Sequence, residues 1–169
     1  MTPPGAYHDP VHELPDDLLR LEPGTIVYHS PLRSGPDADT WSITVPLAPF
    51  SAEDRFDPGT FRPGTDGPDV ISTAVRGEFI GLPGGDLDAL SGRTFEFPAS
   101  PYDDGYIDAS IYLCGAHNPL DVTRIEFGTA RSGHIDAVLH VVFDFTQENV
   151  EIDNRPAVLR AALRYERFD

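Results

Sequence analysis

The sequence predicts an all-β fold, either an antiparallel β-sandwich or an open barrel of about eight strands, with a short N-terminal arm or helical turn. Apolar and polar residues alternate in several segments, and this period of two is that of a strand rather than a helix. The connecting segments are short and rich in glycine, proline and aspartate, which leaves little room for crossover helices. The segment 134–146 shows the alternation most clearly.

The segment 134–146 is predicted to be a long strand on which the sheet is built. Its odd positions are apolar from Ile135 to Phe145, whereas its even positions include Asp136 and His140. Two valines also occupy the even face, which indicates a central strand whose second side is partly covered. The odd face is therefore expected to form the core.

The chain divides into an N-terminal arm, residues 1–24, and a single β domain, residues 25–169. The arm is rich in proline and acidic residues, and 14–21 is expected to form one or two helical turns that cover an edge of the sheet without entering the core. The further strands are expected at 25–30, 40–47, 70–82, 93–97, 105–114, 122–127 and 157–168. Gly77 marks an expected β-bulge.

Two connections and the last segment carry specific expectations. The segment 48–68 contains three phenylalanines, so it is expected to dock on the sheet or to act as a binding loop. The segment 115–121 is expected to be a loop within a three-stranded antiparallel meander that covers 105–146. The last segment, 157–168, fits either a strand or a helix, and we favour the strand because its alternation is more regular.

The composition limits the partners of the protein. The formal net charge is −16, and all twelve basic residues are arginine. This charge argues against nucleic acid or an anionic membrane as a ligand, because both are bound through cations. It permits a basic protein partner, or serves solubility alone. Cys114 is the only cysteine, which excludes an internal disulfide and favours the cytoplasm.

Four polar residues are candidates for a metal or small-ligand site. His134, Asp136 and His140 share the polar face of one strand, and His117 lies in the predicted loop before it. Imidazole and carboxylate groups are common metal ligands, but a face with ordinary charge pairs explains the same pattern. No cofactor is therefore expected, and the ligand-binding domain, with possible enzyme activity, is the alternative hypothesis.

A catalytic corner is a weaker alternative. Cys114, His117 and Asp121 could act as nucleophile, base and orienting residue, yet no activating helix terminus or cation is evident near the cysteine. A structural turn is the preferred interpretation.

The leading hypothesis is a non-catalytic cytoplasmic domain that binds a basic protein partner. In composition, this small, acidic, cysteine-poor chain resembles toxin-neutralising immunity proteins, a resemblance that covers no motif and transfers no residue. Scaffolding is an equivalent possibility. Aromatic residues dominate interface hot spots. The anchors expected on this basis are Phe50, Phe56, Phe61, Tyr102, Tyr106 and Tyr112.

Overall fold

The computed structural model describes residues 13–32, 34–51, 70–113, 115–148, 150 and 152–169. These residues form an all-β structure, as predicted. The strands are β1 Gly24–His29, β2 Thr40–Pro46, β3 Phe50–Ser51, β4 Val70–Ile71, β5 Ala74–Ile80, β6 Thr94–Glu96, β7 Asp108–Leu113, β8 Ala116–Phe127, β9 His134–Phe143 and β10 Arg155–Phe168. Among the described residues, the helical elements are three short 3₁₀ turns, η1 Asp16–Leu18, η2 Leu87–Ala89 and η3 Thr146–Glu148.

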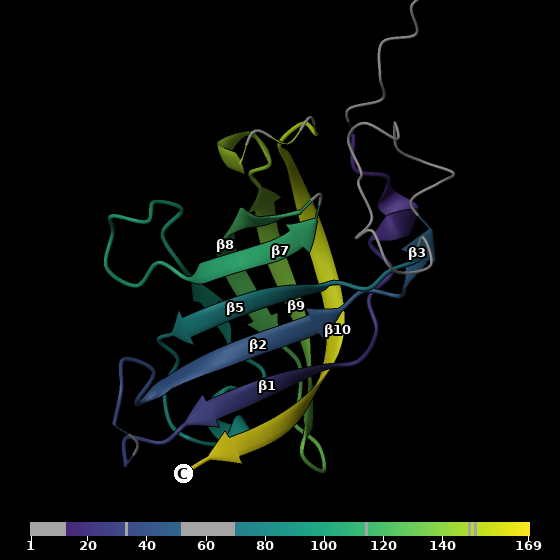
Figure 1. Ribbon diagram of the computed structural model, residues 1–169. Helices are drawn as coiled ribbons and strands as arrows, with labels where there is room; N and C mark the ends of the chain where they lie inside the picture. Colours follow the sequence, from purple (N-terminus) through teal and green to yellow (C-terminus); the bar gives the residue numbers. More distant parts are fainter. Residues whose placement is uncertain (1–12, 33, 52–69, 114, 149, 151) are drawn as a thin grey trace, which may run out of the picture.

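The main sheet closes into a barrel and does not split into a sandwich (Figure 1). Its strand order is β6-β8-β7-β5-β2-β1-β10-β9, and β8 also pairs with β9, so seven strands form a ring and β6 lies outside it. The pair β1–β10 is parallel and the other pairs are antiparallel. The expected all-β class is therefore confirmed, and the expected sandwich or open barrel is corrected to a closed one.

Two irregularities in the strand register help the sheet to curl. In the ladder between β2 and β5, Ile43 pairs with Gly77 and Trp41 pairs with Ile80. The β5 side therefore has one residue more than the β2 side between these two pairs. This is where the sequence predicted a bulge. The second irregularity lies in the β8–β9 ladder, between Val122 and Arg124. Bulges increase local twist and bend the strand, which explains why a single sheet can close on itself.

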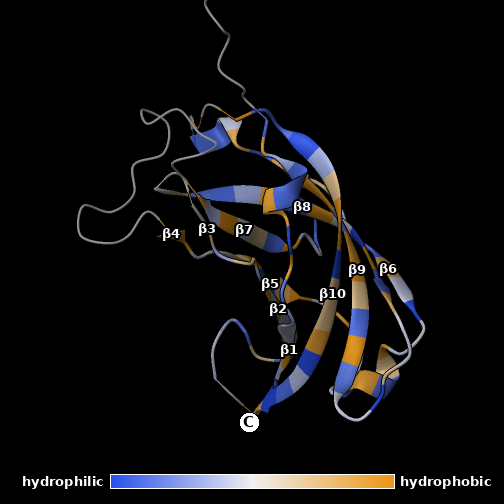
Figure 2. Ribbon diagram, turned by 90° about the vertical axis from the view of Figure 1, so that its right-hand side faces the viewer, coloured by the Kyte–Doolittle hydropathy of each residue, from blue (hydrophilic) through white to orange (hydrophobic). Residues whose placement is uncertain are grey.

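The strand β9 is central and has the predicted two faces. It pairs with β10 on one side and β8 on the other. The odd positions from Ile135 to Phe143 are buried, whereas Asp136 is exposed. Figure 2 shows the resulting alternation of hydrophobic and hydrophilic bands along β9 and β10. The C-terminal segment is thus a strand, and the periodicity outweighed the helix propensity of its residues.

The meander β7–β8–β9 is confirmed, but the predicted loop at 115–121 is wrong. The strand β8 begins at Ala116 and continues without a break through Pro119. Asn118 occupies an inward position and is fully buried. Its side-chain amide donates hydrogen bonds to the carbonyl oxygens of Leu113 at 3.0 Å and Ala116 at 3.1 Å. These bonds allow a polar, turn-favouring residue to remain inside a strand.

The described part of the N-terminal arm enters the core, contrary to expectation. Leu14 and Leu18 are 1% and 4% exposed. Arg155, at the start of β10, donates a hydrogen bond of 2.7 Å to the carbonyl oxygen of Leu14 and forms an ion pair with Asp16. The two leucines therefore belong to the hydrophobic core, and the arginine ties them to the beginning of the last strand.

Aromatic side chains from distant strands meet in another part of the core. Trp41 is fully buried, and its indole nitrogen donates a hydrogen bond of 3.2 Å to the carbonyl oxygen of Gly84. The rings of Tyr28 and Tyr165 lie 5.1 Å and 5.9 Å from the Trp41 ring. A side chain at Gly85 would approach the Tyr28 ring to 2.6 Å, so this close packing requires glycine.

Candidate interaction surface

The proposed metal ligands do not converge. His134 has a hydrogen bond of 3.1 Å to the carbonyl oxygen of Ser132, at the turn before β9. His134 and Asp136 line a shallow hollow of about 270 Å³. Within the described ranges, no group of three or more histidine, cysteine or acidic side chains is arranged to hold a metal ion.

His140, the third candidate on β9, belongs to a charge network on the outside of the barrel. Its Nε2 lies 2.6 Å from Oε1 of Glu126 on β8, and Arg124 contacts the same oxygen at 2.7 Å. The hydrogen bond from His140, followed by the charge of Arg124, lowers the pKa of the Glu126 carboxyl although partial burial opposes this shift. The cluster has the character of a cross-strand ion pair and not of a metal site.

The residues of the supposed catalytic corner have separate partners. The imidazole of His117 packs against the ring of Tyr112 with centroids 4.9 Å apart. Asp121 accepts a hydrogen bond of 3.1 Å from the hydroxyl of Tyr106. Cys114 lies outside the described residues. The structure therefore does not bring His117 and Asp121 together.

The three phenylalanines expected as anchors have different positions. Phe50 is 8% exposed and belongs to the hydrophobic core, so it does not offer a surface anchor. Phe56 and Phe61 lie outside the described residues.

The tyrosines are more accessible. Tyr102 is 96% exposed, in the segment 98–107 that projects from the barrel between β6 and β7 at the left of Figure 1. Tyr112 is 51% exposed. With His117 and Arg76, Tyr112 lines an open groove of about 760 Å³ over β2, β5, β7 and β8. Tyr106 is half-buried near the start of β7.

The carboxylates around Tyr106 affect the pKa of its phenol. Burial, followed by the charge of Asp121 and its hydrogen bond, raises the pKa of the Tyr106 phenol to about 12. Asp108 and Asp144 raise it further. The environment of this phenol is therefore dominated by negative charge.

We expect Asp121→Asn to lower the pKa of Tyr106 towards its ordinary value near 10, because the charge and the charge-assisted hydrogen bond are both lost. Absorbance titration of the tyrosinate band would measure the change. In the parent protein, the raised pKa favours the folded state fully below the unfolded pKa, and this contribution disappears as the pH rises from about 10 to 12. An unchanged Tyr106 titration in the variant would contradict the assignment.

Two acidic residues face each other on neighbouring strands close to Tyr106. Glu78 on β5 is the register partner of Asp108 on β7, and both are exposed. The next pair, Gly77 and Ala109, is buried, so Glu78 and Asp108 both point outward. Like charges directly opposite in a sheet are unfavourable, and a bound cation would relieve them.

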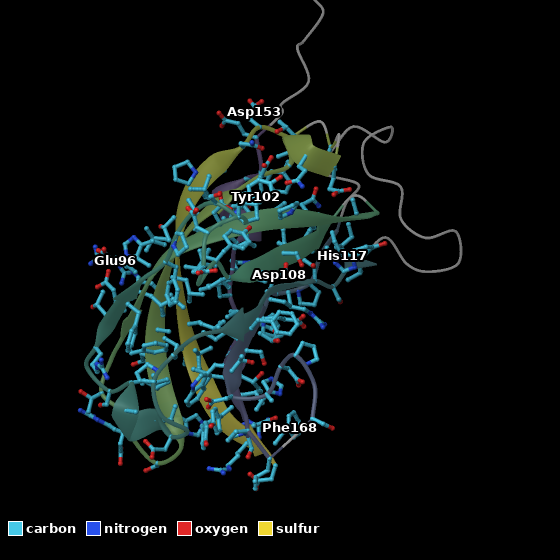
Figure 3. The ribbon with its side chains drawn as sticks, turned by 90° about the vertical axis from the view of Figure 1, so that its left-hand side faces the viewer. Glu96, Tyr102, Asp108, His117, Asp153 and Phe168 are labelled. Atoms are coloured by element: carbon cyan, nitrogen blue, oxygen red, sulfur yellow. The ribbon has the colours of Figure 1, made fainter. Side chains whose placement is uncertain are left out.

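These residues form one surface, which we call the acidic surface. Figure 3, viewed from the side of the projecting segment, shows Tyr102 and Asp108 on this face. The acidic surface consists of Glu78, Tyr102, Asp103, Asp104, Tyr106, Asp108 and Asp121. Sequence reasoning identified the tyrosines, but it missed the pairing of Glu78 with Asp108 because strand register is not visible in the sequence.

Comparison with protein families, with curated proteins and with solved structures finds no match for this chain. None of the helices in the described part of the chain has the length and apolar character needed to cross a membrane.

Proposed function

We propose that this protein is a non-catalytic binding domain whose acidic surface takes a basic protein partner, as a neutralising or scaffolding protein does. The observation that carries the proposal is the exposed Tyr102 beside the outward-facing carboxylates of Glu78 and Asp108. The single cysteine of the sequence supports a cytoplasmic setting for this role.

The charge distribution favours encounter with a cationic surface. A net charge of −16 attracts a basic partner over distance and speeds association, an effect that salt weakens. At the surface itself, a guanidinium or ammonium group between Glu78 and Asp108 would replace a repulsion with two attractions. Net charge alone does not give specific recognition, because an acidic protein attracts every cation.

Tyr102 supplies the specific element. Its ring is accessible on all sides and stands among acidic residues, so it can pack against the side chain of an arginine or lysine. Tyrosine also provides a large contact area with few rotatable bonds, which limits the entropy lost on binding.

A labelled peptide of alternating arginine and serine residues provides a defined probe. We expect the double variant Asp103→Asn and Asp104→Asn to weaken its affinity by roughly threefold to tenfold, because each exposed pair contributes about 0.2–1 kcal/mol. Fluorescence anisotropy at a fixed ionic strength would measure the affinities.

The matched control removes two charges elsewhere. The double variant Glu22→Gln and Asp136→Asn also removes two negative charges but changes exposed residues outside the acidic surface. We expect its effect to stay below about twofold, because salt screens distant exposed charges. Tyr102→Ala should also weaken binding, and Tyr102→Phe should retain it. If the two double variants lost the same amount of affinity for the peptide, net charge alone would explain the binding, and the proposal would be contradicted.

A further inference from the structure

The barrel wall has a gap beside the first half of β10. The ladder between β1 and β10 begins at the pair Gly24–Leu163, so no described strand pairs with Arg155–Ala162 on the side of β1. In Figure 1 the chain that leads from η1 into β1 bends away from the upper part of β10. A groove of about 360 Å³ lies there, with Leu19 and Leu21 on one wall and Ala157 to Arg160 on the other.

The β10 wall presents backbone groups to this groove that no described strand pairs. The amide of Tyr165 donates to Gly133 on the side of β9, and the carbonyl oxygen of Phe168 accepts from Ser30 on the side of β1. Backbone groups alternate sides along a regular strand, and the register of β10 is unbroken. The N–H and C=O groups of the even residues Val158 and Arg160 therefore point towards the gap.

The opposite wall is an extended segment that forms a single isolated bridge, from Leu21 to Leu47. Glu22 and Arg20 use their backbone groups to bond Pro46 and Ala48, on the side of β2. The intervening Leu21 therefore directs its own N–H and C=O away from β2 and towards the groove. Thus both walls offer main-chain donors and acceptors, which is the arrangement left when one strand of a sheet is missing.

We propose that this groove binds an extended peptide segment of a partner protein, which enters between residues 19–22 and β10 as an added strand. An extended peptide has free donors and acceptors on both edges and can pair with both walls at once. A helix uses its backbone groups internally and would leave the groove unpaired. This surface is separate from the acidic surface, so the inference does not depend on the function proposed above.

A second copy of this chain does not fit as the occupant. Its corresponding strand, β10, already pairs with β9 and would offer one free edge to a groove with two. In the amino-terminal segment 1–12, Pro3, Pro4 and Pro10 lack the N–H group that a paired strand needs, so only residues 5–9 could compete, and protection of Val158 in the protein alone would reveal them.

The side chains define the sequence that the groove would take. Leu21 and Ala157 are half-buried and Leu159 is buried, so alternate inward side chains of the peptide should be apolar. Arg20 and Arg160 are exposed on the two walls, and the charge of Arg160 also acts on Glu126 of β8. An acidic residue at the outward position between them is therefore favoured. The pattern is apolar, acidic, apolar.

The free protein gives the first test, by amide hydrogen exchange. The amides of Leu159 and Ala161 face β9 and should be protected, whereas those of Val158 and Arg160 should exchange quickly. Protection of Val158 and Arg160 in the protein alone would show that the edge is already covered and would overturn the proposal. So would a concentration-dependent dimer that protects these same amides in sedimentation and exchange experiments.

The second test adds the capped pentapeptide Thr-Val-Glu-Val-Thr. We expect this peptide to slow exchange at Val158 and Arg160, and Val158→Pro to weaken its binding by about tenfold, because proline removes one edge donor. The ladder with β9 is not affected, since the amide of Val158 faces the gap. Absence of binding at millimolar peptide, or unchanged binding to a folded Val158→Pro variant, would overturn the proposal.

A charge exchange keeps the test decisive if the proline variant does not fold. Arg160→Glu should weaken binding of the peptide that has glutamate at its centre. A peptide with lysine at its centre should bind this variant with the affinity restored. A matched change outside the groove, Arg164→Glu, should leave both peptides unaffected; Arg164 lies where β1 and β10 already pair. Equal responses of the two arginine variants would contradict the assigned position of the peptide.

Discussion

Replacing Phe143 by alanine is expected to lower the free energy of unfolding by about 3–5 kcal/mol, the range for truncating a buried phenylalanine. Phe143 is fully buried at the end of β9, and its ring stacks on that of Phe145 with centroids 5.6 Å apart. Its backbone is in register with Leu120 of β8 and Arg155 of β10. Removing the ring would therefore leave a cavity between three strands. The strand β9 is paired with both of the others, so the three cannot move to fill it.

Denaturant unfolding of the variant measures this loss. A control truncation, Val158→Ala, removes an exposed side chain from the adjacent strand and should change the stability by no more than about 0.5 kcal/mol. A loss below about 1 kcal/mol in Phe143→Ala would mean that β9 is not the central strand of the core.

The variant Asn118→Asp is expected to make stability strongly dependent on pH. The amide of Asn118 donates to carbonyl oxygens, and its own Oδ1 is buried without a hydrogen-bond partner among the described atoms. A carboxylate in this position would face oxygens from two strands and lose its hydration, so the folded protein should hold the carboxyl group neutral. Its pKa in the folded state would then lie well above the unfolded value of about 3.9.

The sign of the effect follows from proton linkage. A raised folded pKa leaves stability intact below the unfolded pKa and removes it as the pH increases. Between about pH 4 and pH 7 the variant should lose about 4 kcal/mol, since each unit is equivalent to 1.36 kcal/mol. Chemical denaturation across this range measures the slope. Asn118→Ser should be destabilised without the added pH dependence, and a flat profile for Asn118→Asp would place residue 118 outside the barrel.

Local periodicity predicted the strands that carry the core. Alternation alone located β9 and assigned β10 as a strand despite its helix-favouring composition, because burial on one face of a sheet imposes a period of two. The glycine at position 77 likewise indicated the irregularity in β5. These features depend on residues within one segment, which is why the sequence reveals them.

Features that depend on distant partners were not predictable in this way. Asn118 and Pro119 are residues typical of a turn. The Asn118 side chain can be buried within β8 because its amide donates hydrogen bonds to three carbonyl oxygens, which the sequence does not reveal. The burial of Leu14 depends on where the arm meets Arg155, which lies far away in sequence. Closure of the barrel also rests on a parallel contact between the first strand and the last.

The candidate surface was predictable only in part. Tyr102 and Tyr106 were identified from residue type, and the negative charge suggested the kind of partner. The juxtaposition of Glu78 with Asp108 required the register of β5 and β7. The gap beside Val158 was equally hidden, since it lies before the point at which β1 and β10 begin to pair.

An NMR titration of the isotope-labelled protein with the arginine–serine peptide tests the central claim most directly, because each backbone amide reports its own position. If the acidic surface is the binding site, the largest shifts will fall on Tyr102 to Asp108 and on Glu78 and Asp121, and they will saturate together with one affinity. Shifts of similar size at Glu22 and Asp136, or shifts that never saturate, would contradict a specific site.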